Sequence, residues 1–563
     1  NIFYTGINLG AAISPLLCGY VGETYGWHYG FGLATIGMLV GLAVFVMPNR
    51  LTSVLILTGA IATAIGMLLF RPDNPLAIAV NLFVALCLII SAVISSRAVN
   101  RGGLPAWAGG RPEGMDARND WKIYLGIALA IPTFALLVSG FSPFTQPPVD
   151  EATGLPVPVP TNEERMATKM NQLEKFEVEP GIITAVREKG IDGEFKQHGK
   201  PFQLIPDDVI ERVQGDSFIG NMAGIFLEEI SKPAGLVLTI LGLLAFGYLL
   251  KETFRLDRIP RQRMMAALVL IFFQMLFFAF FEQAGSSVNN FTDRNIDRVG
   301  ESETVSTDMV GQTVRLEPTQ AQLGYERNGE VFTLSDLDAL RKVVYETPGV
   351  DNIDIAWTFT ENNVGMGIAK RLDELPASIF QSFNSVFILI FALALNWLWR
   401  TLSKRSLDPP APVKFGLGLI QLGLGFGAFW LGAQNCNSLG MVTITWLTLG
   451  ILLQTTGELF LSPVGLSAMT KLSPKALVST LMGAWFLATA FSQYLAGIIS
   501  QFTSVDSSQS SGDFPTPNET VNIYGDVFGN IALAAIVCGG LCMLLSPILN
   551  RWMHADAAES VNR

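Results

Sequence analysis

Long runs of apolar residues recur along the 563-residue chain. A helix that crosses a bilayer needs about 20 mostly apolar residues. Windows of that length predict twelve spans, close to residues 2–21, 27–46, 52–70, 76–95, 121–141, 234–250, 264–283, 377–400, 414–432, 441–461, 477–500 and 525–548. Two polar stretches, 142–233 and 284–376, interrupt the series. The pattern predicts an all-α polytopic membrane protein with two long loops.

Basic residues of the short loops fall mainly on one side of the predicted membrane, which sets the orientation because such residues stay in the cytoplasm. The opposite short loops hold Arg71, and both long stretches share that exterior side. The cytoplasmic group includes Arg50, Arg97, Arg101, Arg111, Arg118, Lys122, Lys251, Arg255, Arg258, Arg261, Arg263, Arg400, Lys404, Arg405, Lys414, Lys471, Lys475, Arg551 and Arg563. Span 1 is therefore expected to start in the cytoplasm.

Composition excludes a soluble enzyme, because half of the residues are hydrophobic and only 15% are charged. Nucleic-acid binding is not expected; the net charge of −11 would argue against it if the charges were evenly spread, but their uneven partition matters more because it sets the topology. The sequence has no zinc-protease, serine-hydrolase or phosphate-loop motif, and its three histidines are too scattered to suggest a metal site. The glycine series Gly416, Gly418, Gly423, Gly425 and Gly427 lies inside an apolar span, which favours close helix packing over a phosphate loop.

The second polar stretch carries signals of folded structure. The string GYERNGEVF from Gly324 predicts a hairpin that turns at Asn328 and Gly329. Ser335 is expected to cap a helix that runs through Tyr345.

Two carboxylates stand in or beside apolar spans, where a charge is expensive. Glu458 is the charged residue of an otherwise apolar span, which indicates a substrate or proton site, although a structural hydrogen bond or a shallow position is the alternative. Glu282, next to Gln283, ends an apolar run at its predicted exterior end. It is either an exterior gate or proton-binding group, or a boundary acid without a function.

Three further polar or amphipathic residues lie on predicted spans: Asn8, Asn384 and Trp485. Taken singly, each favours a structural role, because Asn commonly bonds helix to helix and Trp favours interfaces or pocket walls.

Four strings, in order, resemble the proton-dependent oligopeptide transporter family of the major facilitator superfamily. They are FYTGINLGAAISPLLCGYVGETYGWHYGFGLATIGM from Phe3, FFAFFEQAGSSVNNF from Phe277, FQSFNSVFILIFALALNWLW from Phe380 and GELFLSPVGLSAMTKLSPKALVSTLMGAWFLATAFSQYLAGI from Gly457. They correspond to family helices 5 and 6, 7, 8, and 10 to 11.

The resemblance implies a carrier that imports di- and tripeptides by alternating access, driven by the proton as coupling ion and with no other cofactor or metal. It implies that Asn8, Asn384 and Glu458 hold the peptide amino terminus and that Trp485 walls a side-chain pocket. Glu282, beside Gln283, matches the family's helix 7 acid, which the resemblance assigns to proton coupling or the exterior gate. A monomeric unit in a cell membrane, most simply a bacterial inner membrane, is expected.

The chain departs from the family pattern, because family helices 1 to 4 have no counterpart and four predicted spans stand between helices 6 and 7. The expected organisation is therefore a truncated major facilitator fold. Its segments are 1–47 (helices 5 and 6), 48–263 (an insertion with four spans and exterior segment 142–233), 264–283 (helix 7), 284–376 (exterior) and 377–563 (helices 8 to 12).

Two other functions remain open at this point. Within the same fold, the chain could carry amino acids, nitrate or drugs, since fold does not determine substrate. It could also be a receptor or scaffold that transports nothing and binds partners through its acidic exterior segments.

Overall fold

A computed structural model describes most of the helical part of the chain. The described residues are 2–25, 27–46, 49–69, 75–101, a few positions between 121 and 133, 159–190, 203–214, 218–301, 303–347, 349–350, 352–474, 477–502 and 516–554.

Within these ranges, nine helices are long and apolar enough to cross a membrane. Predicted span 27–46 is confirmed as the helix Trp27–Val46, and predicted span 2–21 lies within a nearly continuous helical run from Ile2 to Tyr25. Predicted span 121–141 lies almost entirely outside the described residues. The other predicted spans are confirmed as helices, and the protein is an integral membrane protein.

The chain divides into two compact units. The first comprises residues 1–103, 170–189 and 256–563, and the second comprises 104–169 and 190–255. The candidate site residues Asn8, Glu282, Gln283, Asn384, Glu458 and Trp485 all belong to the first unit.

The N-terminal helices pack through one apolar core. α1 (Ile2–Ser14), a π-helical turn (Pro15–Gly19) and α2 (Tyr20–Tyr25) form a nearly continuous run, followed by α3 (Trp27–Val46), α4 (Asn49–Leu69) and α5 (Pro75–Asn100). The wider turn begins at Pro15, which lacks the N–H that a regular helix needs. Leu9 of α1 shares a buried cluster with Met67 of α4, Val84 of α5 and Val386 of α15 (Gln381–Lys404).

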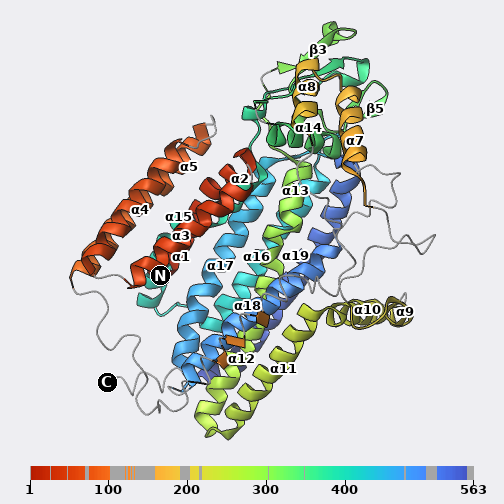
Figure 1. The fold of residues 1–563 in the computed structure, drawn as a ribbon. Coiled ribbons are helices and arrows are strands. Elements are labelled where there is room, and N and C mark those ends of the chain that lie inside the picture. Colours follow the sequence, from red (N-terminus) through yellow and green to blue (C-terminus); the bar gives the residue numbers. More distant parts are fainter. Residues whose placement is uncertain are drawn as a thin grey trace. The chain divides into compact units, whose positions relative to one another are not determined.

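The C-terminal helices pack against one another. These helices are α12 (Arg258–Phe281), α15, α16 (Ala411–Gln434), α17 (Ile444–Leu472), α18 (Val478–Gln501) and α19 (Pro517–Met553), seen side by side in Figure 1. A Cβ atom at Gly418 would lie 2.7 Å from the carbonyl oxygen of Gly457 on α17. A Cβ atom at Gly423 would lie equally close to the carbonyl oxygen of Ala532 on α19. Close helix packing is thus confirmed for Gly416, Gly418, Gly423 and Gly425, while Gly427 has no such neighbour.

Replacing Gly418 by alanine should destabilise this bundle. The added methyl group meets backbone, which cannot rotate away, so we expect a loss of about 1–3 kcal/mol, as for other overpacked interiors. Gly427→Ala is the matched control on the same helix, because its methyl group would enter open space. Thermal unfolding in detergent measures both variants; equal melting temperatures would contradict the close approach at Gly418.

The apolar run that contains Glu282 ends with helix α12, whose C-cap residue is Glu282, as expected from the sequence. A short 3-10 turn (Glu282–Gly285) follows, and the polar helix α13 (Ser287–Asn295) continues the helical stretch. Val288 and Phe291 of α13 are buried, and the Phe291 ring lies 5.3 Å from that of Phe528 on α19. The polar residues after Glu282 therefore form a helix that packs against α19.

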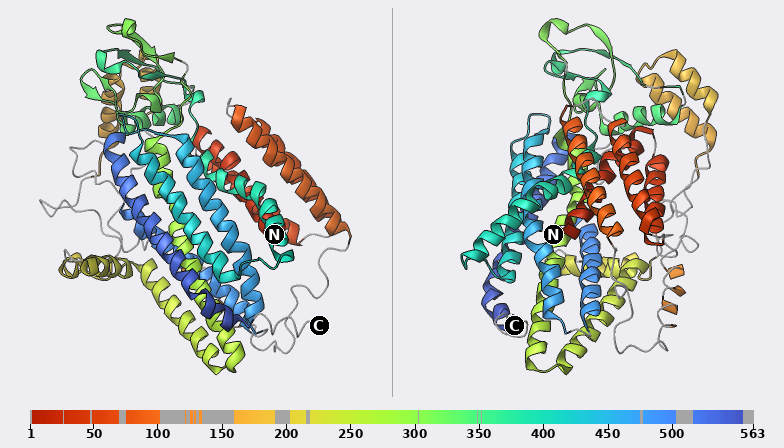
Figure 2. Two further views of the ribbon diagram at one scale, coloured as in Figure 1. Left: turned by 180° about the vertical axis from the view of Figure 1, so that it is seen from behind. Right: turned by 90° about the vertical axis from the view of Figure 1, so that its left-hand side faces the viewer.

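Residues 296–376 and 170–189 form a small folded body at one end of the C-terminal helices, which we call the cap (Figure 2). Its strands pair antiparallel as β2 (Glu303–Thr304) with β7 (Gly367–Ile368), β3 (Thr313–Leu316) with β6 (Ile355–Thr358), and β4 (Glu326–Arg327) with β5 (Glu330–Val331). Two helices complete it, α8 (Pro180–Lys189) and α14 (Leu334–Glu346).

The structure confirms the predicted hairpin and corrects the predicted helix start. Asn328 and Gly329 both have positive φ, as the tight turn between β4 and β5 requires. The N-cap of α14 is Thr333, not Ser335. Thr333 Oγ1 accepts from the backbone N–H of Asp336, whose carboxylate accepts from the Thr333 N–H, so the capping box forms two residues earlier than expected.

The two polar stretches of the sequence meet in the cap. Arg327 is 5% exposed, and its guanidinium donates to the carbonyl oxygens of Ala356 and Lys175. The Phe176 ring lies 5.8 Å from that of Phe332. Segment 170–189 therefore contributes to the core of the cap although it is far away in sequence.

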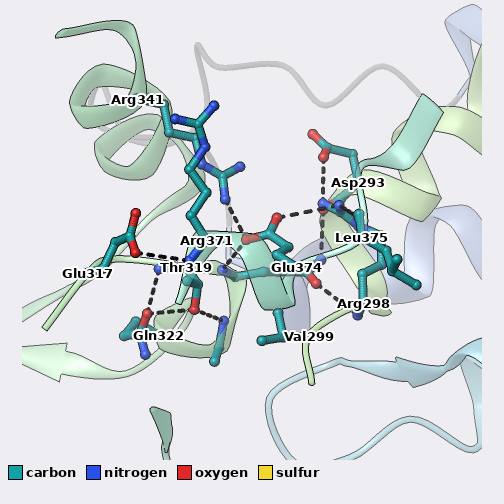
Figure 3. Close-up of polar contacts among 12 residues, drawn as sticks. Asp293, Arg298, Val299, Glu317, Thr319, Gln322, Arg341, Arg371, Glu374 and Leu375 are labelled. Carbon is teal, nitrogen blue, oxygen red and sulfur yellow. Dashed lines mark hydrogen bonds and ion pairs between the residues drawn. The ribbon is translucent and has the colours of Figure 1, made fainter. Parts of the chain in front are cut away.

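The cap is joined directly to the ends of the helices. β1 (Ile296–Asp297) pairs in parallel with β8 (Val442–Thr443), which lies between α16 and α17. Asn295 donates to the carbonyl oxygens of Gly440 and Pro517, and Thr520 donates to Asn295 Oδ1. A buried ionic cluster around Glu374 lies beside this junction (Figure 3).

The second unit contains α9 (Asp207–Val213), α10 (Phe218–Ser231) and α11 (Pro233–Arg255), together with the first part of α7 (Asn162–Lys175). Of these, α11 is a candidate membrane span and α9 packs against α10.

Candidate functional site

Glu458 and Asn384 meet on neighbouring helices. Glu458 is 7% exposed and lies near the middle of α17, with Asn384 near the start of α15. Asn384 Nδ2 donates to Glu458 Oε2 at 3.0 Å. The structure therefore brings together two of the predicted site residues that are far apart in sequence.

Thr455 joins this pair, and sequence reasoning missed it. Asn384 Nδ2 also donates to Thr455 Oγ1 at 3.1 Å, and Thr455 Oγ1 donates to the carbonyl oxygen of Ile451 at 2.7 Å. Residues 455 and 458 are three apart, so they share a face of α17. That spacing is the signal that could have identified Thr455. The two bonds hold the Asn384 side chain in one orientation.

Asn8 is buried, at 6% exposure, on α1. α1 packs against α15, which carries Asn384, and the next residue, Leu9, belongs to the core cluster that includes Val386 and Leu389. Asn8 is thus on a helix beside the Asn384–Glu458 pair, while its direct participation in the site stays a prediction.

Trp485 of α18 packs against the face of α17 that carries Glu458, farther along that helix. A Cβ atom at Gly465 would collide with the Trp485 ring and lie 3.0 Å from Cζ of Phe415. Gly465 follows Glu458 by seven residues, which is two helical turns and about 10 Å. The indole is 4% exposed and packs against this glycine in the present conformation.

Gln283 and Glu282 lie where α12 gives way to the 3-10 turn. Gln283 is fully buried; its amide donates to the carbonyl oxygen of Ala496 on α18 at 3.0 Å and accepts from Ser287 Oγ at 2.8 Å. Gln283 thus ties the turn to α18. Glu282 is half-buried, and Gln493 of α18, another residue that sequence reasoning missed, is a polar neighbour of its carboxylate.

The Asn384–Glu458 pair offers acceptor oxygens inside an apolar bundle. A carboxylate next to an oriented amide suits a small cation such as an ammonium group, because a buried charge needs both an opposite charge and hydrogen bonds. In the described part of the chain, no group of three or more His, Cys, Asp or Glu residues could hold a metal ion.

Comparisons with known proteins agree with this geometry in the segments that contain the pair. A model of the POT family matches residues 1–71 and 363–518, which include Asn8, Asn384, Glu458 and Trp485. The match includes the strings from Phe3, Phe380 and Gly457 but not the string from Phe277.

Curated relatives match the chain over a limited length. "Uncharacterized transporter YclF" of Bacillus subtilis is 41% identical over 180 residues, which cover 32% of this chain and 33% of that protein. "Dipeptide and tripeptide permease A" of Erwinia pyrifoliae is 35% identical over 186 residues, 33% of this chain and 35% of that protein. The chain thus spans about a third of these relatives.

Among solved structures, a peptide transporter POT in complex with sulfate is 22% identical, with a TM-score of 0.39, covering 98% of this chain and 94% of that one. The family assignment rests on the sequence matches. Segments 1–71 and 363–518 of this integral membrane protein are thus similar to the POT family.

Proposed function

We propose that the chain acts in a proton-coupled symporter that imports di- and tripeptides by alternating access. The observation that carries the proposal is the Asn384–Glu458 hydrogen bond, deep in the helical bundle and inside the segments of POT sequence. The relative from Erwinia, which matches part of the chain, is named a dipeptide and tripeptide permease. A permease for such substrates needs a side chain that pairs with the charged amino terminus of the peptide.

In this proposal Glu458 neutralises the peptide ammonium group and Asn384 contributes its amide oxygen. Both N–H groups of Asn384 are used by Glu458 and Thr455. Asn384 can therefore accept a hydrogen bond from a ligand through its amide oxygen. Asn8 adds a second amide from α1, and Trp485 supplies an aromatic wall about two turns of α17 away. An aromatic face accommodates side chains of varied shape, as a general peptide carrier requires.

We also propose a topology and a cellular setting. The spans between residues 48 and 263 would be inserted between family helices 6 and 7, and the cap would face the exterior of a bacterial inner membrane. The transport unit would be a monomer in the lipid bilayer, and the proton would be its coupling ion, with no other cofactor. Basic residues such as Lys404 and Arg405, at the end of α15 away from the cap, support this orientation.

Uptake measurements test the function directly. Cells that express the gene product containing this chain should accumulate a labelled dipeptide when the outside is acidic, and a proton uncoupler should stop accumulation. Uptake of amino acids, nitrate or drugs instead would assign a different carrier. Normal membrane insertion without uptake of any of these would point to a receptor or scaffold.

Glu282→Gln should uncouple transport from the proton. Glutamine permanently mimics the protonated carboxylate, while its amide can still act as a polar neighbour of Gln493. We expect loss of peptide accumulation against a gradient but retention of counterflow exchange, which needs no net proton movement. Both activities are measured in proteoliposomes with a labelled dipeptide.

Two outcomes would contradict that role. If both activities persist at wild-type rates, Glu282 carries no coupling proton. If both disappear, it holds structure or substrate. Gln493→Leu is a useful companion variant, because it removes the polar neighbour of Glu282 but keeps the titratable group.

A further inference from the structure

The helical pair α9–α10 directly precedes the membrane span α11. Lys232 is the one residue between α10 and α11, and Pro233 begins α11. A proline at this position interrupts the backbone hydrogen bonds of a continuous helix. Figures 1 and 2 show α10 turning sharply away from the axis of α11. The short connection keeps α10 at the depth where α11 enters the bilayer.

One face of α10 is covered by α9 and its flanking residues. The backbone N–H of Leu204 donates to the carbonyl oxygen of Ser231 at 2.8 Å. A Cβ atom at Gly224 would lie 2.7 Å from Cβ of Gln214, just beyond the end of α9. Gly224 and Ser231 are seven residues apart and so share a face. Ile210 of α9 is 5% exposed in this contact.

The opposite face of α10 is apolar, and in the described part of the unit its largest side chain, that of Phe226, is exposed. Ala223, Phe226 and Ile230 follow the spacing of three and four residues that places side chains on one helical face. Phe226 is 57% exposed. On α9, Val209 and Val213 are four residues apart and are 37% and 43% exposed. A water-facing helical pair would not keep large apolar side chains in these positions.

Charged groups lie where α10 meets α11. Lys232 Nζ lies 3.1 Å from Glu228 and 2.5 Å from Glu229. This ionic group lies at the start of α11, and Lys251 lies near the other end of the same helix. Between them, the side chains of Leu243 and Leu244 are 69% and 65% exposed. The level of Lys232 is therefore that of the lipid headgroups. Acidic residues outnumber basic ones in helices α9 and α10. This favours contact with a zwitterionic rather than an anionic lipid surface.

We propose that α9 and α10 form an interfacial anchor that lies in the plane of the membrane, with the Phe226 face in contact with lipid. Helices of this kind insert their apolar face at the boundary between headgroups and acyl chains. The anchor would fix the entry angle of α11 and tether the preceding chain to the bilayer surface. It does not depend on the transport function proposed above.

Photocrosslinking in proteoliposomes of phosphatidylcholine tests the anchor without any transport assay. A benzoylphenylalanine residue, close in shape to phenylalanine, replaces Phe226 in the whole chain. The same residue at Leu243 is the positive control in the span, and at Val364, 41% exposed in the cap, it is the negative control. After irradiation, mass spectrometry identifies what each position has captured.

We expect lipid adducts at position 226 at a yield comparable to that at 243 and at least several-fold above that at 364. Adducts of position 226 with other residues of the chain, or a lipid yield no higher than at 364, would overturn the proposal. The first of these results would show that the Phe226 face packs against protein, and the second that it faces water. Correct insertion is checked by the lipid adduct at 243.

Discussion

Glu458→Gln should abolish detectable binding of dipeptides with a free amino terminus while leaving the protein folded. Glutamine has nearly the same shape, and its carbonyl oxygen can still accept from Asn384 Nδ2, so the α15–α17 contact persists. It cannot supply the charge that a buried ammonium group needs. Losing one charged hydrogen bond costs about 1.5–3 kcal/mol, which corresponds to roughly 10- to 150-fold in affinity, and the additional unpaired charge increases the loss.

The ligand provides the matched control for this variant. An N-acetylated dipeptide lacks the ammonium group, so the wild type should bind it as poorly as the variant binds the free dipeptide. Acetylation should cause little further loss in the variant, because the carboxylate is already absent. Binding is measured by thermal shift and by calorimetry in detergent. Equal affinity of wild type and variant for the free dipeptide would remove Glu458 from the binding site.

The positions of the spans could be predicted from sequence because a bilayer imposes one length and one polarity on each helix. The glycines of α16 were also predictable, since small residues in an apolar span commonly allow close approach. Gly427 shows the limit of that argument. Sequence alone does not tell which face of a helix meets a neighbour, and this glycine has none within 4 Å.

Contacts between distant segments were harder to predict. Asn384 and Glu458 each break an apolar pattern, but their hydrogen bond depends on how α15 and α17 pack, and their pairing could be expected only from a family resemblance. Glu282 was placed at the end of a span because the residues after it are polar. Those residues form α13, whose buried side chains Val288 and Phe291 contribute to the packing with α19.

The long-range contacts of the cap left no trace in the local sequence. Arg327 looks like a surface residue in a hairpin, yet its guanidinium is buried by segment 170–189, which precedes it by about 150 residues. The ionic cluster of Figure 3 is similar, because it joins residues from α13, α14 and the end of the cap. Such charges are costly to bury singly, and only their assembly makes each of them acceptable.

Glu374 is at the centre of this cluster. Its side chain is 5% exposed and lies 3.4 Å from Arg298, a second ion pair joins it to Arg341, and it accepts from the backbone N–H of Gln320. Burial alone would raise the pKa of Glu374, but the nearby Arg341 and Arg298 more than offset that effect and lower it below the ordinary value. The ionised carboxylate therefore stabilises the cap.

Glu374→Gln should loosen the cap at neutral pH, because it leaves the buried Arg298 and Arg341 without their shared counter-charge. Removing one partner from a buried ion pair costs about 3–5 kcal/mol. Hydrogen exchange at the amides of β3 and β6, measured by mass spectrometry in detergent, should report correspondingly faster opening. Glu303→Gln is the matched control, since Glu303 is exposed on strand β2 of the same cap. Equal protection in both variants would contradict the assignment.

The same carboxylate predicts how the cap responds to acid. Because the folded-state pKa of Glu374 is lowered, its contribution is fully present above the ordinary glutamate value of about 4.3 and is lost as the pH falls through the folded-state pKa. Wild-type protection of β3 and β6 should therefore decline below that pH, while Glu374→Gln, already without the charge, should change less. The difference between the two proteins should narrow steadily as acid is added. A difference that stays constant down to pH 3 would show that a group other than Glu374 controls the acid sensitivity of the cap.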